Sequence, residues 1–283
     1  YRVQSSSQEK TITWSDQAML VNEIDASGAE DQTAAADPVV YAIPLRARTS
    51  DEEWDQTQRQ LTRTLASVLR QTAGDFIAVV SGHDKPALPD DPRVIWLAAH
   101  TEKPTTAALG SRDKTMKRKA ILEYAAKEYP KGFYYFLLDS DDLLHNRVNS
   151  FIQETAHANG YYISSGYFFD VSTGRLALSS PKNRPFYKSC GSCAVIKFTE
   201  DTLSKASKMN QLFELTTRHA TIPESAASIG FPLQELPFAA AVYVLNHGVN
   251  LSSEQGKSAT QIKHANAHAI DSDEEVRRIL SYF

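Results

Sequence analysis

Three aspartates stand within four positions of the chain, in the segment FYYFLLDSDDLL at 133–144. Carboxylates spaced this closely repel one another at neutral pH unless a cation neutralises them. Mg²⁺ and Mn²⁺ prefer oxygen ligands, and two or so carboxylates leave positions open for the phosphates of a substrate. Asp139, Asp141 and Asp142 are therefore candidate ligands of Mn²⁺ or Mg²⁺. The segment DSDD is also suited to capping a helix that begins behind it.

Basic residues precede the aspartates in the segment SRDKTMKRKA, which carries Arg112 near its start. A helix is predicted over 113–128, and Lys114, Lys117 and Arg118 share one of its faces near the first turns. A bound diphosphate needs such countercharge, and a helix N-terminus also favours anions. An ordinary solvated helix face has the same composition, so both interpretations stay open.

The elements that must position these residues alternate between strands and helices. Short apolar runs predict strands at 39–45, 76–81, 93–98 and 133–138. Helical spacing predicts helices at 57–72 and 113–128. This alternation predicts an α/β fold with a mainly parallel sheet and helices on both faces. Ligands bind beyond the carboxyl ends of strands in such sheets, which favours metal binding over capping for the aspartates.

Apolar positions also predict which helix faces are buried. In the helix at 113–128 the predicted apolar stripe consists of Met116, Ala120, Ile121, Tyr124 and Ala125. A capped helix is predicted in SDEEVRRILSYF, with Val276, Ile279, Leu280 and Phe283 on one face. Between these helices, another helix is predicted at about 147–158, and GYYISSGYFFD, CAVIKF and FAAAVYVL are strand candidates.

Composition shifts divide the chain into three parts. Residues 1–37 are polar and rich in Ser, Ala, Gln and Asp, which predicts an extension or linker. Residues 38–252 form the main domain, and 253–283 form a tail that ends in a helix. The whole chain has 283 residues and a net charge of −4, which gives no bulk electrostatic reason to bind nucleic acid.

Cysteine usage and hydropathy bear on the compartment. Cys190 and Cys193 form a CxxC motif, and no second motif or nearby His pair completes a zinc site. We therefore expect two reduced, structural thiols in a cytoplasmic protein. No apolar run approaches the roughly 18 residues that a membrane span requires, although contact with a membrane surface stays open.

Five segments follow one another as they do in a known enzyme family: VVYAIPLRAR, LTRTLASVLRQTAGDFIAVVS, DPRVIWL, RDKTMKRKA and YYFLLDSDDLL. In order and spacing the chain resembles family-two glycosyltransferases over about residues 38–252, and SVLRQT followed by LDSDD is the most specific part. The resemblance implies a GT-A fold, which is a Rossmann-like, mixed and mostly parallel sheet flanked by helices. It also implies a UDP-, GDP- or dTDP-sugar donor and a saccharide or lipid-linked saccharide acceptor. The branch it resembles is bacterial, which implies a role in surface polysaccharide or exopolysaccharide synthesis.

The resemblance also implies roles for individual residues. The loop after the first strand borders the nucleotide through Pro44, Leu45 and Arg46, and Asp84 in SGHDKP is the nearest match to the acid that contacts the base. In the DxD motif, Asp139 and Ser140 face the nucleotide or the metal shell, and Asp141 and Asp142 hold the metal. His247 in VLNHGVNLS matches a later histidine ligand of the family, although a lone histidine is more often a surface or core residue.

An inverting transfer also needs a base that deprotonates the acceptor hydroxyl. The family places it in an ED pair, which this chain lacks in its second half, so Glu224, Glu235 and Asp170 all remain candidates. Two other functions stay open. A nucleotidyltransferase of sugar phosphates requires a glycine-rich loop after the first strand, and PLRARTSDEEW contains no glycine. A non-catalytic nucleotide- or carbohydrate-binding module is consistent with the missing pair.

Overall fold

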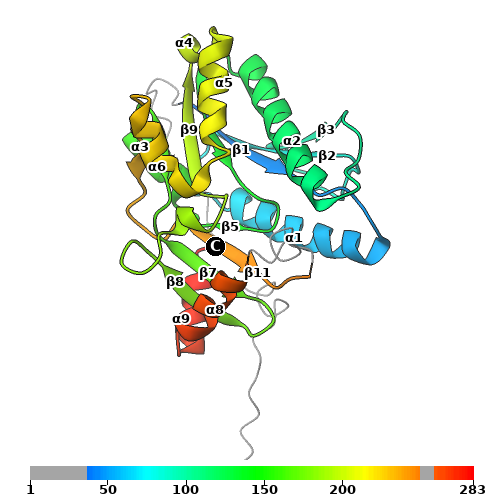
Figure 1. The fold of residues 1–283 in the computed structure, drawn as a ribbon, viewed down its shortest axis with the longest axis vertical. Helices are drawn as coiled ribbons and strands as arrows, with labels where there is room; N and C mark the ends of the chain where they lie inside the picture. Colours follow the sequence, from blue (N-terminus) through cyan, green and yellow to red (C-terminus); the bar gives the residue numbers. More distant parts are fainter. Residues whose placement is uncertain (1–36, 249–257) are drawn as a thin grey trace, which may run out of the picture.

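Two β-sheets organise the part of the chain that the computed structural model describes, namely residues 37–248 and 258–283 (Figure 1). The extension predicted for 1–37 lies outside the described residues except for Asp37. Among the described residues, no helix combines the length and the apolar character of a membrane span.

The main sheet has seven strands in the order β10-β6-β9-β4-β1-β2-β3. Its strands are β1 (Val39–Pro44), β2 (Phe76–Gly82), β3 (Val94–Ala98), β4 (Gly132–Leu137), β6 (Gly160–Tyr162), β9 (Ala194–Thr199) and β10 (Gln234–Glu235). The four strands predicted in the first half are confirmed and run parallel to one another. Strand β9 runs antiparallel to both β4 and β6. The chain therefore has a mixed α/β fold, compatible with a Rossmann-like architecture, in which helices flank a central sheet.

Helices α1 (Asp51–Leu69), α2 (Ala107–Glu128) and α3 (Val148–Thr155) confirm the helices predicted at 57–72, 113–128 and about 147–158. Helix α1 begins earlier than 57 because the Ser50 side chain caps it, accepting a hydrogen bond from the Glu53 amide. In Figure 1, α1 lies at the boundary between the two sheets, against β5. Helix α2 packs on β1, β2 and β4.

Helix α2 departs from its predicted pattern in its N-terminal half. It begins at Ala107, behind a Thr106 cap, so Lys114 stands about two turns inside the helix rather than near its start. Met116 is 42% exposed, so its predicted place in the apolar stripe is wrong. The buried positions there belong to Asp113, Lys117 and Arg118, because this half of the helix faces a polar cleft. Further along, Ile121 and Ala125 are buried as predicted.

A second, four-stranded sheet has the order β5-β11-β7-β8. It consists of β5 (Leu143–Leu144), β11 (Ala241–Leu245), β7 (Gly166–Asp170) and β8 (Arg175–Ser179). The segment GYYISSGYFFD is therefore two strands in two different sheets, β6 and β7, rather than one strand. Strands β9 and β11 confirm the other two strand candidates.

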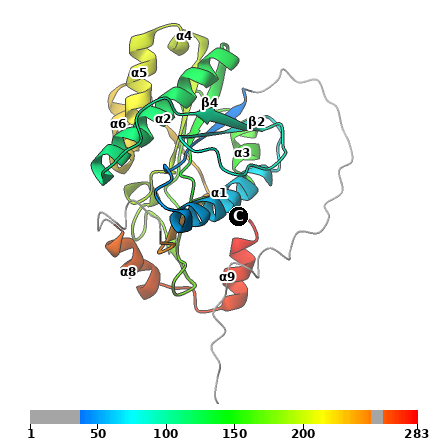
Figure 2. The same ribbon diagram turned by 90° about the vertical axis from the view of Figure 1, so that its right-hand side faces the viewer.

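The C-terminal helices cover the second sheet (Figures 1 and 2). Helix α9 (Asp273–Leu280) is capped by Ser272, and its predicted apolar face packs with Leu143, Phe169 and Val242 of the sheet. Helix α8 (Ala259–Ala267) packs on β7 and β8. Helices α4 (Glu200–Leu203), α5 (Ala206–Leu215) and α6 (Ile222–Ser228) follow β9 and lie at the end of the molecule away from α8 and α9.

Candidate functional site

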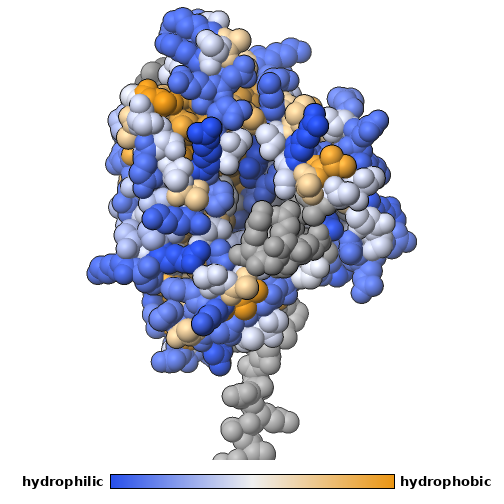
Figure 3. All heavy atoms as spheres, in the orientation of Figure 1, coloured by the Kyte–Doolittle hydropathy of each residue, from blue (hydrophilic) through white to orange (hydrophobic). Residues whose placement is uncertain are grey.

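A cleft of about 830 Å³ opens beyond the carboxyl ends of β1 and β4, where an open α/β sheet binds its ligands. Its first half is lined by Pro44, Leu45, Arg46, Asp113, Lys114, Lys117, Arg118, Asp139, Ser140 and Asp141, and its second half by Lys188, Ser189, Thr217, His219, Tyr243 and Gln261. The face of the molecule shown in Figure 3 is mostly hydrophilic, with apolar residues in small separate groups. The cleft thus brings together the first strand, the basic helix and the DxD motif, as the sequence predicts.

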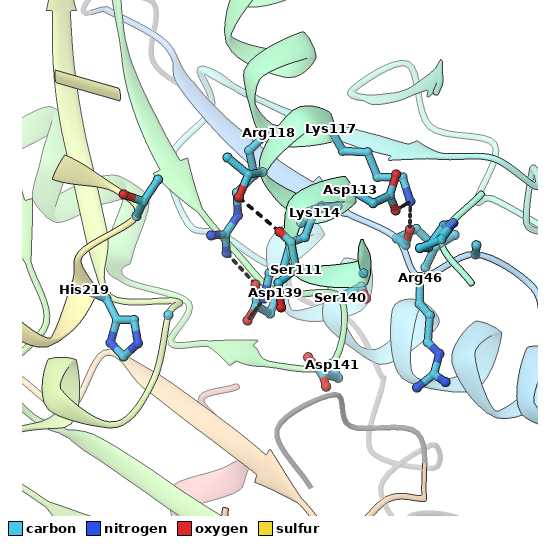
Figure 4. A pocket seen from close by; sticks show the side chains of 18 of the residues that line it. Arg46, Ser111, Asp113, Lys114, Lys117, Arg118, Asp139, Ser140, Asp141 and His219 are labelled. Carbon is cyan, nitrogen blue, oxygen red and sulfur yellow. Dashed lines mark hydrogen bonds and ion pairs between the residues drawn. The ribbon is translucent and has the colours of Figure 1, made fainter. Parts of the chain in front are cut away.

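Asp139 is held by two cations of the facing helix (Figure 4). Its carboxylate oxygens accept hydrogen bonds from Lys114 Nζ and from an Arg118 guanidinium nitrogen, each at 2.7 Å. The two cations are four residues apart and therefore lie on one face of α2. Burial raises the pKa of Asp139, but Lys114 and Arg118 outweigh it and lower the pKa to about 2. Asp139 is therefore ionised at neutral pH.

Asp141 projects into the cleft from the same loop (Figure 4). His247 Nε2 donates a hydrogen bond to its carboxylate over 2.9 Å, because the carboxylate can only accept. The imidazole is 1% exposed, and its Nδ1 atom has no hydrogen-bond partner among the described residues. The structure thus brings together Asp141 and His247, which are 106 residues apart in the sequence.

Asp142 belongs to the aspartate cluster by distance and to the core by its hydrogen bonds. Its side chain is fully buried, and it accepts hydrogen bonds from Ser192 Oγ at 2.5 Å, Cys190 Sγ at 3.2 Å and the Val244 amide at 3.3 Å. Burial and the charges of Asp141 and Asp139 raise its pKa well above the usual range. Asp142 therefore sits behind the cleft and is held there by the protein.

The CxxC motif supplies part of this support. Ser192 Oγ also accepts a hydrogen bond from the Asp139 amide at 2.9 Å, so one hydroxyl links the first and last aspartates of the motif. Cys190 and Cys193 are free, buried thiols, and burial raises the pKa of each. The motif's role here is to support the aspartate loop from behind.

The aspartate cluster fits a divalent cation by its chemistry. Asp139, Asp141 and Asp142 each offer a carboxylate oxygen, and these oxygens lie within 4.8 Å of one another. The alternative role in helix capping is excluded, because the next helix, α3, begins only at Val148 and has no side-chain cap. Since Asp142 is turned toward the core, Asp139 and Asp141 are the members that face the cleft.

A second ion network supports the half of the cleft that borders the loop after β1. Asp113 lies 2.9 Å from His83 Nε2 and accepts hydrogen bonds from Thr101 and Lys117. Lys117 also donates to the Leu45 carbonyl oxygen at 2.8 Å, which fastens the loop after β1 to α2. Burial lowers the pKa of Lys117, against the opposing effect of Asp113. Lys117 thus shapes the loop and differs in role from Lys114 and Arg118.

Two residues assigned to the nucleotide lie elsewhere. Arg112 is exposed on α2 and does not line the cleft. Asp84 accepts hydrogen bonds from Lys103 Nζ at 2.7 Å and from the Arg48 amide at 3.1 Å, and it does not line the cleft either. Asp84 therefore ties together two loops at the rim.

The three candidate bases all lie outside the cleft lining. Asp170 is buried at the end of β7, and Glu224 is exposed on α6. Glu235 on β10 accepts hydrogen bonds from the Tyr162 and Ser164 hydroxyls. The structure instead places His219 in the cleft lining, with Nδ1 2.7 Å from the Tyr187 carbonyl oxygen. No periodicity in TTRHAT marks this histidine, so only the tertiary fold reveals it.

Comparison with known proteins found no match: no family model matches the chain, and no curated protein matches it either. What the site can do chemically therefore rests on its own geometry. The carboxylates of Asp139 and Asp141, with Lys114 and Arg118 of α2 beside them, suit an anionic substrate bound together with a divalent cation.

Proposed function

We propose that the chain is a metal-dependent glycosyltransferase of the GT-A type, which transfers a sugar from a nucleotide-sugar to a saccharide or lipid-linked saccharide. The observation that carries this proposal is that Asp139 and Asp141 face the same cleft as Lys114 and Arg118, at the carboxyl edge of a parallel sheet. This arrangement provides ligands for a cation and countercharge for a diphosphate in one place.

The donor's binding mode follows from the lining of the cleft. The nucleoside lies along the loop after β1, at Pro44–Arg46, whose position Lys117 fixes. The diphosphate lies between the aspartates and α2, where Lys114 and Arg118 donate to its oxygens as well as to Asp139. Mn²⁺ or Mg²⁺, held by Asp139 and Asp141 with His247 orienting Asp141 through its Nε2–H, would supply positive charge to the departing diphosphate.

The order of strands supports the same function. The strands β3-β2-β1-β4 are parallel and are followed by the antiparallel β9, so the donor half of the cleft is built on the parallel half of the sheet. The motif SVLRQT spans the C-terminal end of α1 and the residues that follow it, and LDSDD forms the loop after β4. Together with the resemblance of these motifs to family-two glycosyltransferases, this arrangement supports an inverting transfer in bacterial surface polysaccharide or exopolysaccharide synthesis.

Donor turnover tests this proposal directly. Release of nucleoside diphosphate is measured from UDP-, GDP- and dTDP-sugars with Mn²⁺ or with EDTA. We expect release from one donor, dependent on the cation and lost in Asp141→Ala. Asp201→Ala is the matched control, because this exposed aspartate pairs with Lys205 and Lys208 on the surface.

Two outcomes would contradict the proposal. Absence of turnover and of metal-dependent nucleotide binding with every donor would overturn it altogether. Metal-dependent nucleotide binding without release from any donor would instead indicate a non-catalytic binding module.

A further inference from the structure

The second half of the cleft contains an imidazole whose ring is fixed by the backbone. His219 begins a 3-10 turn, His219–Thr221, between α5 and α6, and it lines the cleft together with Thr217 and Ala220. Its Nδ1 atom lies 2.7 Å from the Tyr187 carbonyl oxygen. A carbonyl oxygen can only accept a hydrogen bond, so Nδ1 carries the proton in the neutral ring. The lone pair is therefore on Nε2.

The position of His219 relative to the donor half is visible in Figure 4. Arg46 and His219 lie on opposite sides of the view, with Asp139 and Asp141 between them. A donor with its nucleoside near Arg46 and its diphosphate at the aspartates thus presents its sugar toward the His219 side. This is the side from which an acceptor would approach.

Other proton-accepting groups of the cleft lining are engaged within the protein. Asp113 accepts hydrogen bonds from Thr101 and Lys117 and contacts His83. Asp139 is held by Lys114 and Arg118, and Asp141 by His247. For His219, the structure shows a bond at Nδ1 and none from Nε2 to another described residue. Nε2 is therefore the lining atom best suited to take a proton from a substrate.

We propose that His219 is the general base of the transfer, an inference that rests on the proposed glycosyltransferase function. Nε2 removes the proton from the acceptor hydroxyl as its oxygen forms a bond to the anomeric carbon. The bond between that carbon and the diphosphate oxygen breaks, and its electron pair leaves with the nucleoside diphosphate. The Tyr187 carbonyl stabilises the imidazolium through Nδ1–H, and the proton then passes to solvent.

His219 could also matter only because its bond to Tyr187 holds the turn in place. The variants are chosen to separate these roles. His219→Asn places an amide N–H where Nδ1–H stands, so it keeps a donor for the Tyr187 carbonyl and removes the base. His219→Gly removes both and leaves room for added imidazole. His157→Asn is the matched control, because its Nδ1 contacts the Gly160 carbonyl at 3.0 Å and it does not line the cleft.

The experiment measures kcat and KM for the donor that the wild-type chain consumes, with p-nitrophenyl monosaccharides as acceptors. We expect His219→Asn to lower kcat by about 100- to 10,000-fold, since general base catalysis contributes this much. KM for the donor and the affinity for the nucleoside diphosphate with Mn²⁺ should stay within about twofold, because only the proton transfer is lost. Imidazole should restore turnover of His219→Gly by about tenfold or more, and His157→Asn should behave like wild type.

The outcomes separate this inference from the function on which it rests. Unchanged kcat in His219→Asn, or a loss in His219→Gly that imidazole does not restore, would overturn the role of His219 while wild-type turnover upholds the transferase. Absence of wild-type turnover with every donor would overturn the proposed function and the role of His219 with it.

Discussion

Two aspartates follow apolar strands in the same way and meet opposite surroundings. Asp139 follows FLL at the end of β4, and Asp170 ends β7 after YFF. The Asp139 carboxylate pairs with two cations and borders an open cleft. The Asp170 carboxylate is buried and accepts hydrogen bonds from neutral donors, which are the Ser172 amide and hydroxyl and the side-chain amides of Asn246 and Asn266.

The difference between Asp139 and Asp170 shows what separates an aspartate that can bind a ligand from one that only supports the fold. Burial raises the pKa of Asp170, but its hydrogen bonds with Ser172, Asn246 and Asn266 outweigh this effect and lower the pKa. The carboxylate is therefore ionised, and its oxygens are occupied by hydrogen bonds within the protein. Around Asp139, two further aspartates stand within reach, and the cleft leaves room for another positive charge. Several carboxylates gathered beside an open cleft at a sheet edge are thus what distinguishes the candidate site from a structural carboxylate.

The largest expected effect comes from neutralising Asp139. Asp139→Asn removes a ligand of the cation and releases Lys114 and Arg118 from their fixed positions. We expect the affinity for nucleoside diphosphate with Mn²⁺ to fall by about 100-fold, at the upper end of what such supporting contacts are worth. Stability should fall by about 1–2 kcal/mol, because Lys114 can turn to solvent whereas Arg118, 10% exposed, loses its charged partner. Calorimetric titration measures the nucleotide affinity, and urea unfolding measures the stability. A large loss of stability with wild-type affinity would show that Asp139 is a structural carboxylate rather than a ligand of the cation.

Asp170→Asn should show the opposite pattern. The asparagine amide group would face donors, leaving the half-buried side-chain amide of Asn246 or Asn266 without an acceptor, so we expect a loss of about 1–2 kcal/mol of unfolding free energy. Nucleotide binding should stay at the wild-type level. Urea unfolding at neutral pH measures the loss, and Asp201→Asn on the surface is the control.

The pH dependence of this loss has a definite sign. The folded-state pKa of Asp170 is lower than 3.8, so in the interval between the two values the unfolded chain binds more protons. The stability that Asp170 contributes is therefore present above about pH 3.8 and is lost as the pH falls through its folded-state pKa. The difference between wild type and Asp170→Asn should shrink over that interval. A constant difference would show that ionisation does not matter there.

A smaller effect on stability is expected for His145, the ionisable residue that directly follows strand β5. Its ring stacks on Tyr282, and its Nδ1 accepts a hydrogen bond from the Arg147 amide at 3.1 Å. Burial, with the charge of Arg147, lowers its pKa from 6.5 to about 4. Wild-type stability should therefore fall as the pH drops from 6.5 to 4, by about 1 kcal/mol since solvent screens the half-buried ring. Thermal unfolding of His145→Gln should lose this dependence, and an unchanged slope would count against it.

The smallest effect is expected for Asp142→Asn. Burial beside two other aspartates favours the neutral acid, which an asparagine resembles in size and charge. We expect a stability change below about 1 kcal/mol and less than a tenfold loss of metal-dependent nucleotide affinity. Titration with the nucleoside diphosphate and Mn²⁺ checks this. A loss as large as that of Asp139→Asn would instead make Asp142 a ligand of the cation.

The half of the site around Asp139 and α2 could be predicted because its signals are local. The apolar run before Asp139 predicts a strand, the spacing of Lys114 and Arg118 predicts a shared helix face, and the sheet rule predicts where they meet. Hydrophobicity alone predicts Met116 in the core, but Met116 is exposed because the N-terminal half of α2 borders a polar cleft.

The rest depends on contacts between distant segments. The second sheet is built from strands as short as Leu143–Leu144, which are too short for periodicity to reveal. His219 reaches the cleft only because the turn between α5 and α6 packs beside Tyr187. Likewise, Ser192 supports the aspartates from a loop about 50 residues later, with no shared motif to indicate it.

The central claim is that Asp139 and Asp141 form a joint site for a divalent cation and a diphosphate. A thermal-shift measurement tests it most directly, with UDP, GDP or dTDP added to the wild-type chain and to Asp141→Asn, each with Mn²⁺ or with EDTA. A nucleotide that binds only together with the cation should raise the melting temperature of wild type when Mn²⁺ is present and not when EDTA is present. The same nucleotide should leave the melting temperature of Asp141→Asn unchanged under both conditions. Equal shifts with Mn²⁺ and with EDTA, or none with any nucleotide, would contradict the claim.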